Sequence, residues 1–111
     1  MIELTLLNYL NTKMSVPAYI EMPPNPPAKF VLMEKTGSRL SNHITASIFA
    51  IQSYAGTMYD AVTLNEELKS VMLGAVELDD ISSVRLNSDY NYTDGATKQY
   101  RYQAIFDITH Y

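Results

Sequence analysis

The N-terminal segment has apolar residues at helical spacing. Ile2, Leu6 and Leu10 lie about one turn apart, so they would form a stripe along one side of a helix. Pro17 forbids a helix that continues past it, because its ring clashes with the preceding turn and it has no N–H to donate. We therefore expect a helix over residues 2–13.

A second helical pattern lies in the middle of the chain. Thr57 is a good N-cap residue and Gly74 is a good residue just past a helix end, which predicts a helix over residues 58–73. Its buried stripe is expected to hold Ala61, Leu64, Asn65, Leu68 and Val71 or Met72. Its solvent-facing side is expected to hold Asp60, Glu66, Glu67 and Lys69.

Five other segments have the alternation or the β-branched and aromatic content of strands. They are Val16–Met22, Phe30–Glu34, Ile44–Tyr54, Ile81–Tyr92 and Gln99–His110. Apolar residues on both faces of the third segment predict a central strand that is covered on both sides. Between the strands we expect a stiff proline-rich turn at 23–27, a polar loop at 35–42, and a hairpin loop at 93–97 in which Asp-Gly adopts positive φ.

The predicted order of elements is α-β-β-β-α-β-β. It indicates an α+β fold, with a single mostly antiparallel β-sheet of about five strands and two flanking helices. The length of 111 residues argues for a single domain over residues 1–111, because two cores in so short a chain would each be poorly buried.

Composition excludes several classes of protein. Hydrophobic residues make up 47% of the chain and charged residues 18%, values that exclude a disordered or collagen-like chain. Cysteine is absent, which excludes disulfides and thiolate metal sites. The net charge of −4 argues against duplex nucleic acid as the main partner. No run approaches the ~20 apolar residues of a membrane span, and the N-terminus lacks the basic start of a secretory leader, so we expect a soluble protein made in the cytoplasm.

The search for catalytic chemistry finds no convergent set of residues. His43 and His110 have no third ligand or nucleophile at a suitable spacing, and they are expected to be polar residues at strand ends. Asp79-Asp80 is expected to be a solvated turn. The run from Lys35 to Arg39 lacks the spacing of a phosphate-binding loop. We therefore expect no catalytic, cofactor-binding or metal-binding residues, and an assembly protein rather than an enzyme.

Four tyrosines flank the last hairpin, with an arginine between two of them. They are Tyr90, Tyr92, Tyr100 and Tyr102, and the arginine is Arg101. Such a set could stack on single-stranded nucleic acid, or it could form cross-strand pairs that are buried at an oligomer interface. The second interpretation is favoured, because the eight basic residues are scattered and form no electrostatic groove.

Several short segments, spread over nearly all of the chain, are informative through their order and spacing. They are Val16-Pro17-Ala18-Tyr19, Pro26-Pro27, the run from Phe30 to Gly37, Ala50-Ile51-Gln52-Ser53-Tyr54-Ala55, the helix with Ala61 and Leu64-Asn65, and the closing run from Tyr100 to Ile108. Taken together, they resemble the tail terminator proteins of phages with long non-contractile tails.

The resemblance implies a structural virion protein at the head-proximal end of the tail, made in the cytoplasm of a bacterial host. Members of this family form a ring, typically a hexamer, that caps the tail tube, ends its polymerisation and forms the surface for head joining. The implied partners are other copies of the chain, the major tail tube protein and the head connector or completion protein. DNA only passes through the lumen, and neither a membrane nor a cofactor is involved.

Two other classes stay open at this point: a related phage head-completion or connector protein, and a non-viral small binding module. For the tail terminator, two loops are candidate interfaces, because surface loops are mobile and often carry function. Their residues are Lys35, Thr36, Gly37, Ser38, Arg39, Leu40, Ser41 and Asn42, and Asp94 and Gly95. In the first loop, Arg39 is expected to pair with a carboxylate of a neighbouring subunit or of the tail tube, and Leu40 to enter an apolar pocket there.

Overall fold

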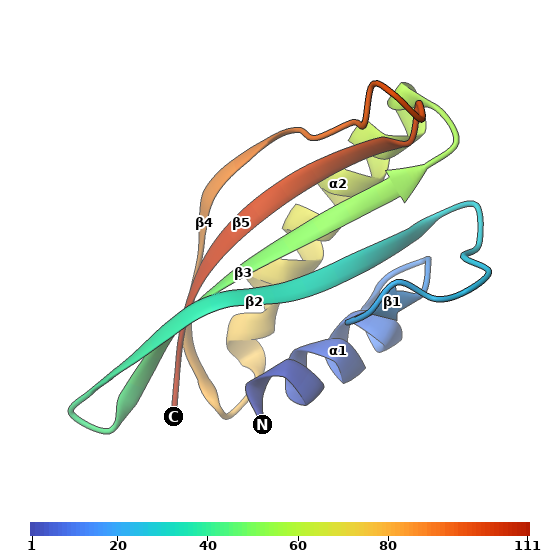
Figure 1. Cartoon of the computed structure of the whole chain (residues 1–111). Helices are drawn as coiled ribbons and strands as arrows, with labels where there is room; N and C mark the ends of the chain where they lie inside the picture. Colours follow the sequence, from blue (N-terminus) through green and yellow to red (C-terminus); the bar gives the residue numbers. More distant parts are fainter.

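A curved sheet with both helices on one of its faces forms the framework of this protein, seen in a computed structural model of residues 1–111 (Figure 1). The elements are α1 (Ile2–Lys13), β1 (Ala18–Tyr19), β2 (Phe30–Ser41), β3 (Ile44–Ala55), α2 (Met58–Leu73), the 3-10 helix η1 (Gly74–Glu77), β4 (Ile81–Asn91) and β5 (Tyr100–His110). The strand order is β1-β2-β3-β5-β4. Only β1 and β2 are parallel, so the expected α+β fold with one mostly antiparallel sheet is confirmed.

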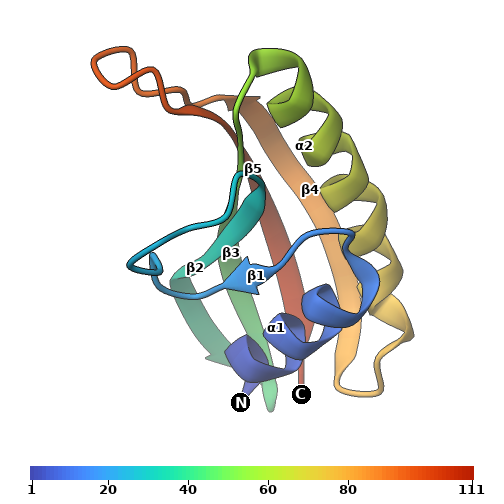
Figure 2. The same cartoon turned by 90° about the vertical axis from the view of Figure 1, so that its right-hand side faces the viewer.

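The hydrophobic core lies between the helices and the inner face of the sheet, as the side view shows (Figure 2). The helices contribute Leu6, Leu10, Leu64, Leu68 and Met72, and the strands contribute Val31, Met33, Phe49, Ile51, Phe106 and Ile108. Both helices have the predicted bounds, because their apolar stripes match this face. In α2 the buried residue at the end of the stripe is Met72, whereas Val71 is half-buried.

The opposite face of the sheet, which we call the outer face, carries no helix. The expectation that the third strand is covered on both sides is therefore wrong. Phe49 and Ile51 of β3 point into the core, but Ile48 points outward and is 42% exposed. Apolar residues do alternate along β3, but both helices pack on the same face, so the outward-facing apolar side chains have no helix over them.

The largest correction concerns the predicted loop at 35–42. The strand β2 continues to Ser41 and pairs with β3 in register as far as Ser41 opposite Ile44. The reversal needs only Asn42 and His43, with φ values of 50° and 66°. Two successive positive φ values are typical of the tight turn that matches the twist of a hairpin. The loop residues thus belong to a strand, interrupted by a bulge at Thr36.

Three smaller expectations are also corrected. The predicted strand at 16–22 is reduced to β1, because the prolines that follow allow only two residues to pair. In the β4–β5 connection, positive φ falls on Lys98 and not on Gly95, and the carboxylate of Asp94 accepts a hydrogen bond from the backbone N–H of Ala96 at 3.0 Å. Gly74 has ordinary helical φ, and the space for a side chain there is filled by the hydroxyl of Tyr9, 2.9 Å from where a Cβ would lie.

The prediction that Glu67 simply faces water is wrong. Its carboxylate accepts hydrogen bonds from the backbone N–H and the hydroxyl of Ser15, both at 2.7 Å, and so holds the chain that leaves α1 against α2. We expect Glu67→Ala to lower the free energy of unfolding by about 0.5–1.5 kcal/mol. Ser70→Ala, at an exposed position of the same helix, is the control and should change it little. Equal effects in chemical denaturation would show that the Ser15 contact contributes nothing.

A polar cluster joins α2 to β4. The carboxylate of Asp89 accepts hydrogen bonds from Asn65 Nδ2 at 2.9 Å and from Lys69 Nζ at 3.0 Å, and Asn65 is buried. The hydrogen bond from Lys69 is the main cause that lowers the pKa of Asp89, while partial burial opposes it. Charged Asp89 therefore stabilises the folded chain.

This cluster predicts a pH-dependent stability. A lowered pKa in the folded state means that the stabilisation is present above the unfolded pKa, about 3.9, and is lost as the pH falls through the folded value. At pH 7, Asp89→Asn should lower the free energy of unfolding by about 1.5 kcal/mol. The difference between the variant and the wild type should shrink as the pH falls below 4, measured by urea unfolding. A difference that stays constant down to pH 3 would contradict the assignment.

Candidate interaction surface

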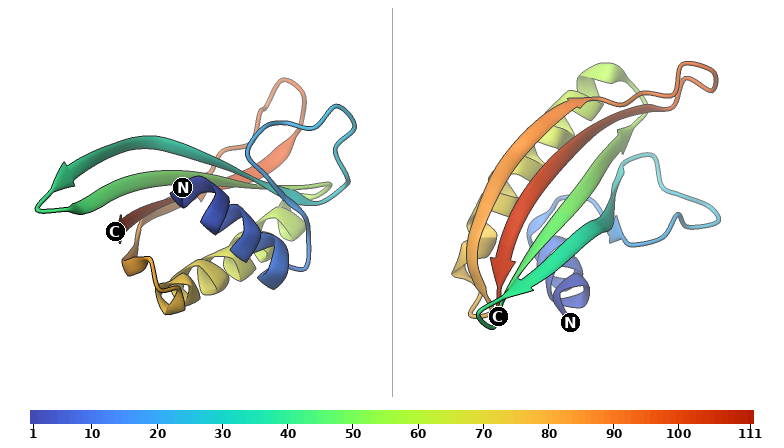
Figure 3. Two further views of the ribbon diagram at one scale, coloured as in Figure 1. Left: turned by 90° about the horizontal axis from the view of Figure 1, so that it is seen from below. Right: turned by 60° about the vertical axis from the view of Figure 1, so that its left-hand side comes forward.

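The β2–β3 hairpin extends past the rest of the sheet and gives the molecule its length of 44 Å against 25 Å and 24 Å in the other directions (Figures 1 and 3). We call residues 38–47 the arm. Leu40 is 72% exposed and Ile44 is 38% exposed, so the arm carries apolar side chains into solvent. These residues are part of a paired strand hairpin and not of an irregular loop.

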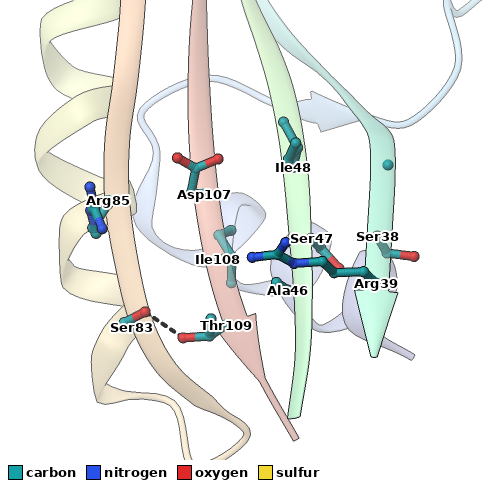
Figure 4. A pocket seen from close by; sticks show the side chains of 11 residues that line it. Ser38, Arg39, Ala46, Ser47, Ile48, Ser83, Arg85, Asp107, Ile108 and Thr109 are labelled. Atoms are coloured by element: carbon teal, nitrogen blue, oxygen red, sulfur yellow. Dashed lines mark hydrogen bonds between the residues drawn. The ribbon is translucent and has the colours of Figure 1, made fainter. Parts of the chain in front are cut away.

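A hollow of about 530 Å³ lies on the outer face where the arm joins the sheet (Figure 4). Its wall crosses four strands, with Arg39 from β2, Ile48 from β3, Asp107 from β5 and Arg85 from β4. At its lower end the hydroxyls of Ser83 and Thr109 are hydrogen-bonded to each other. No contiguous stretch of sequence contains these residues, so only the strand register brings them together.

The hollow carries two arginines without carboxylate partners. The ion pairs of the chain join Lys29 to Asp60, Lys35 to Glu3, and Lys69 to Glu66 and Asp89. No carboxylate oxygen lies within ion-pair distance of Arg39 or Arg85. The one acid in the wall, Asp107, accepts a hydrogen bond from Asn87 Nδ2 at 3.1 Å. The hollow is therefore cationic in a protein of net charge −4.

On the outer face away from the hollow, the side chains pack against one another. The guanidinium of Arg101 lies over the rings of Tyr54, at 5.6 Å from its centroid, and Tyr92, at 4.7 Å. Tyr54 in turn stacks on Phe30 with a centroid distance of 4.5 Å. Because Phe30 and Tyr54 are almost fully buried, this part of the face offers little free aromatic surface for a ligand.

A layer of amides lies next to these rings. Gln52 Nε2 donates to Gln103 Oε1 at 2.7 Å, and Gln103 Nε2 donates to the hydroxyl of Tyr90 at 2.5 Å. These bonds join β3, β5 and β4, and they satisfy polar groups that would otherwise need a partner.

The tyrosines do not form the expected cross-strand pairs with one another, because Tyr90 and Tyr92 are two residues apart on the same side of the hairpin. Tyr90 and Tyr92 contact each other edge to face at 6.1 Å on the outer face. Tyr100 and Tyr102 alternate with Arg101 along β5 and so point to the opposite side of the sheet. Sequence reasoning missed Tyr54, the second ring over Arg101, because it lies in another strand.

The two histidines are not brought together. His43 occupies the exposed turn of the arm, and His110 is buried with its Nε2 at 2.8 Å from the hydroxyl of Ser47. No group of three or more histidine or acidic side chains is arranged to hold a metal ion. Asp79 and Asp80 lie in an exposed turn, as expected.

The residues of the two candidate interface loops lie at different places. Arg39, Gly37 and Ser38 line the hollow, and Leu40 projects from the arm. Lys35 is engaged within the chain, with its ammonium 3.2 Å from the carboxylate of Glu3. Asp94 and Gly95 lie at the far end of the sheet, in the β4–β5 connection.

No protein-family model matches this sequence, and no curated protein is significantly similar to it. Neither helix of the structure is long and apolar enough to cross a membrane.

Proposed function

We propose that this protein is a structural virion subunit that assembles with other copies of itself into a ring, caps the phage tail tube, ends its polymerisation and provides the tail-side surface for head joining. The observation that carries this proposal is the uncovered outer face, which continues into an arm with exposed apolar residues. The resemblance of the short sequence segments supports the choice of the tail terminator among ring-forming proteins.

The exposed arm is costly for an isolated subunit. Leu40 and Ile44 of the arm, and Ile48 next to it, each keep a large apolar side chain in water. Complete burial of such a side chain contributes roughly 1.5–3 kcal/mol to stability. The end of the hairpin, Ser41–Ile44, lies beyond the last β3–β5 pair, Thr45 with His110, and two-stranded hairpins are only marginally stable by themselves. Both features are accounted for if the arm packs against another subunit in the ring or against the tube.

The sheet also has two open edges. The short β1 pairs only with Val31 and Leu32, so β2 is unpaired on that side from Met33 to the turn, and β4 has no neighbour on its outer side. The two edges lie on opposite sides of the sheet and differ in sequence. A contact between different surfaces of identical subunits generates a closed ring or an open filament, as a tail ring requires.

The proposal is tested by particle mass and by tube length. We expect the purified protein to form a discrete oligomer at high concentration, by light scattering, and rings in negative-stain electron microscopy. Tail tube protein assembled in its presence should give tubes of bounded length with the protein at one end. A strict monomer at all concentrations would contradict the proposal, and rings that leave tube length unchanged would favour a head-completion or connector role.

A further inference from the structure

We propose that the cationic hollow receives an acidic turn from a second copy of this chain. The turn comprises residues 77–80, from the last residue of η1 to the residue before β4, and we call it the acidic turn. The inference rests on the proposed function, since it assigns the contact by which neighbouring subunits of the ring recognise each other.

The hollow has the chemistry to bind carboxylates. Arg39 and Arg85 lie on opposite sides of it, on β2 and β4, and neither forms an ion pair in its own chain, although Asp107 lies directly opposite Arg85 in the β4–β5 pairing. A guanidinium offers several N–H donors in a fixed plane, which matches the geometry of a carboxylate. Between the arginines lie Ala46 and the exposed side chain of Ile48 on β3, and Asp107 and Thr109 on β5, so the middle of the hollow is partly apolar and partly polar. One acid, Asp107, reduces but does not cancel this charge.

The acidic turn has the complementary properties. Glu77, Asp79 and Asp80 are exposed, and none of them belongs to an ion pair of the chain. Apolar side chains adjoin them, with Val76 46% exposed and Leu73 48% exposed. The turn is therefore a protrusion with carboxylates beside apolar side chains, and the hollow is a concavity with two guanidiniums on either side of a mixed floor that holds Ile48, Ala46 and Asp107.

The two surfaces lie in different layers of the molecule, although Asp80 is only three residues before Ser83 at the end of the hollow. The acidic turn follows α2, in the helix layer, whereas the hollow is on the sheet face that points away from α2 (Figures 2 and 4). Because they are different surfaces, a contact between them is heterologous and leaves a free acidic turn and a free hollow on every pair, so further copies can add. Charge complementarity favours a second copy as the occupant, since the same chain supplies both the unpaired acids and the unpaired arginines.

The test reverses the charge of each surface separately. The first variant carries Arg39→Glu and Arg85→Glu, and the second carries Asp79→Lys and Asp80→Lys. We expect each variant to keep the wild-type melting temperature within a few degrees but to self-associate roughly 100-fold more weakly, by sedimentation.

Mixing the two variants in equal amounts should restore oligomers, because each normal surface then meets a normal partner and each reversed surface a reversed one. A control with Lys13→Glu and Lys98→Glu changes the net charge as the first variant does, but outside both surfaces, and should associate like the wild type.

The outcomes separate this inference from the proposed function. If the wild type forms oligomers and both charge-reversed variants do so equally well, the hollow is not the contact, while the ring proposal stands. If the variants dissociate but their mixture does not reassemble, or if the Lys13/Lys98 control dissociates as well, specific pairing of the two surfaces is overturned. A wild type that remains a monomer at all concentrations overturns both.

Discussion

Replacement of Leu68 by alanine is expected to lower the free energy of unfolding by about 2–5 kcal/mol. Leu68 lies in the middle of α2 and is fully buried against the inner face of the sheet. The substitution removes apolar contacts and leaves a cavity that the surrounding rigid strands cannot fill.

Leu73→Ala is the matched control for this experiment, because it makes the same chemical change at the end of the same helix. Leu73 is 48% exposed, so its replacement should cost less than about 1 kcal/mol. The two free energies are compared by chemical denaturation at constant pH. Similar losses at both positions would mean that α2 presents a different face to the sheet.

Shortening the arm is expected to abolish assembly while leaving the subunit folded. Leu40–Thr45 would be replaced by Asn-Gly, so that a tight turn joins Arg39 directly to Ala46 and keeps both residues of the hollow. None of the six removed residues is buried, so the free energy of unfolding should change by less than about 1 kcal/mol. The shortened chain lacks Leu40 and Ile44, the most exposed apolar side chains of the arm, so these can no longer contact a neighbouring subunit.

This variant is judged by oligomer mass and by phage assembly. We expect at least a tenfold weaker self-association, and overlong tubes or tails that fail to join heads when the variant replaces the wild-type protein. Leu40→Ser tests the same contact with a single side chain, and it should weaken assembly in the same direction. Normal infectious particles from the shortened chain would show that the arm is a spectator.

The comparison of sequence and structure is clearest at the helices. The spacing of Leu64 and Leu68, with Thr57 before them, was enough to predict the bounds of α2, and the hydroxyl of Thr57 indeed accepts a hydrogen bond from the N–H of Asp60 at 3.1 Å. Such signals are local, since a helix satisfies its backbone within a single segment and its apolar stripe is visible in a window of a dozen residues.

The arm shows where local signals fail. Residues 35–42 have the composition of a loop, yet residues 35–41 form a strand because Ile44 to Phe49 offers a partner whose backbone groups they can satisfy. The true turn, Asn42-His43, contains no glycine and was hidden within a longer polar run. Whether a segment forms a strand depends on another segment with which it can pair, near or far in the sequence. Polar composition alone therefore does not exclude a strand.

The residues of the candidate site could be predicted from the sequence less well than the helices and strands could. Sequence by itself determined the two helices, the α+β class, the order of strands along the chain and the lack of any cysteine chemistry, because each is written in local periodicity or composition. Only the folded sheet decided that Arg39 and Arg85 share one hollow, that Arg101 lies between Tyr54 and Tyr92, and that one face stays uncovered. These are consequences of strand order and register, which place residues from β2, β3, β5 and β4 side by side through pairings that no single segment encodes.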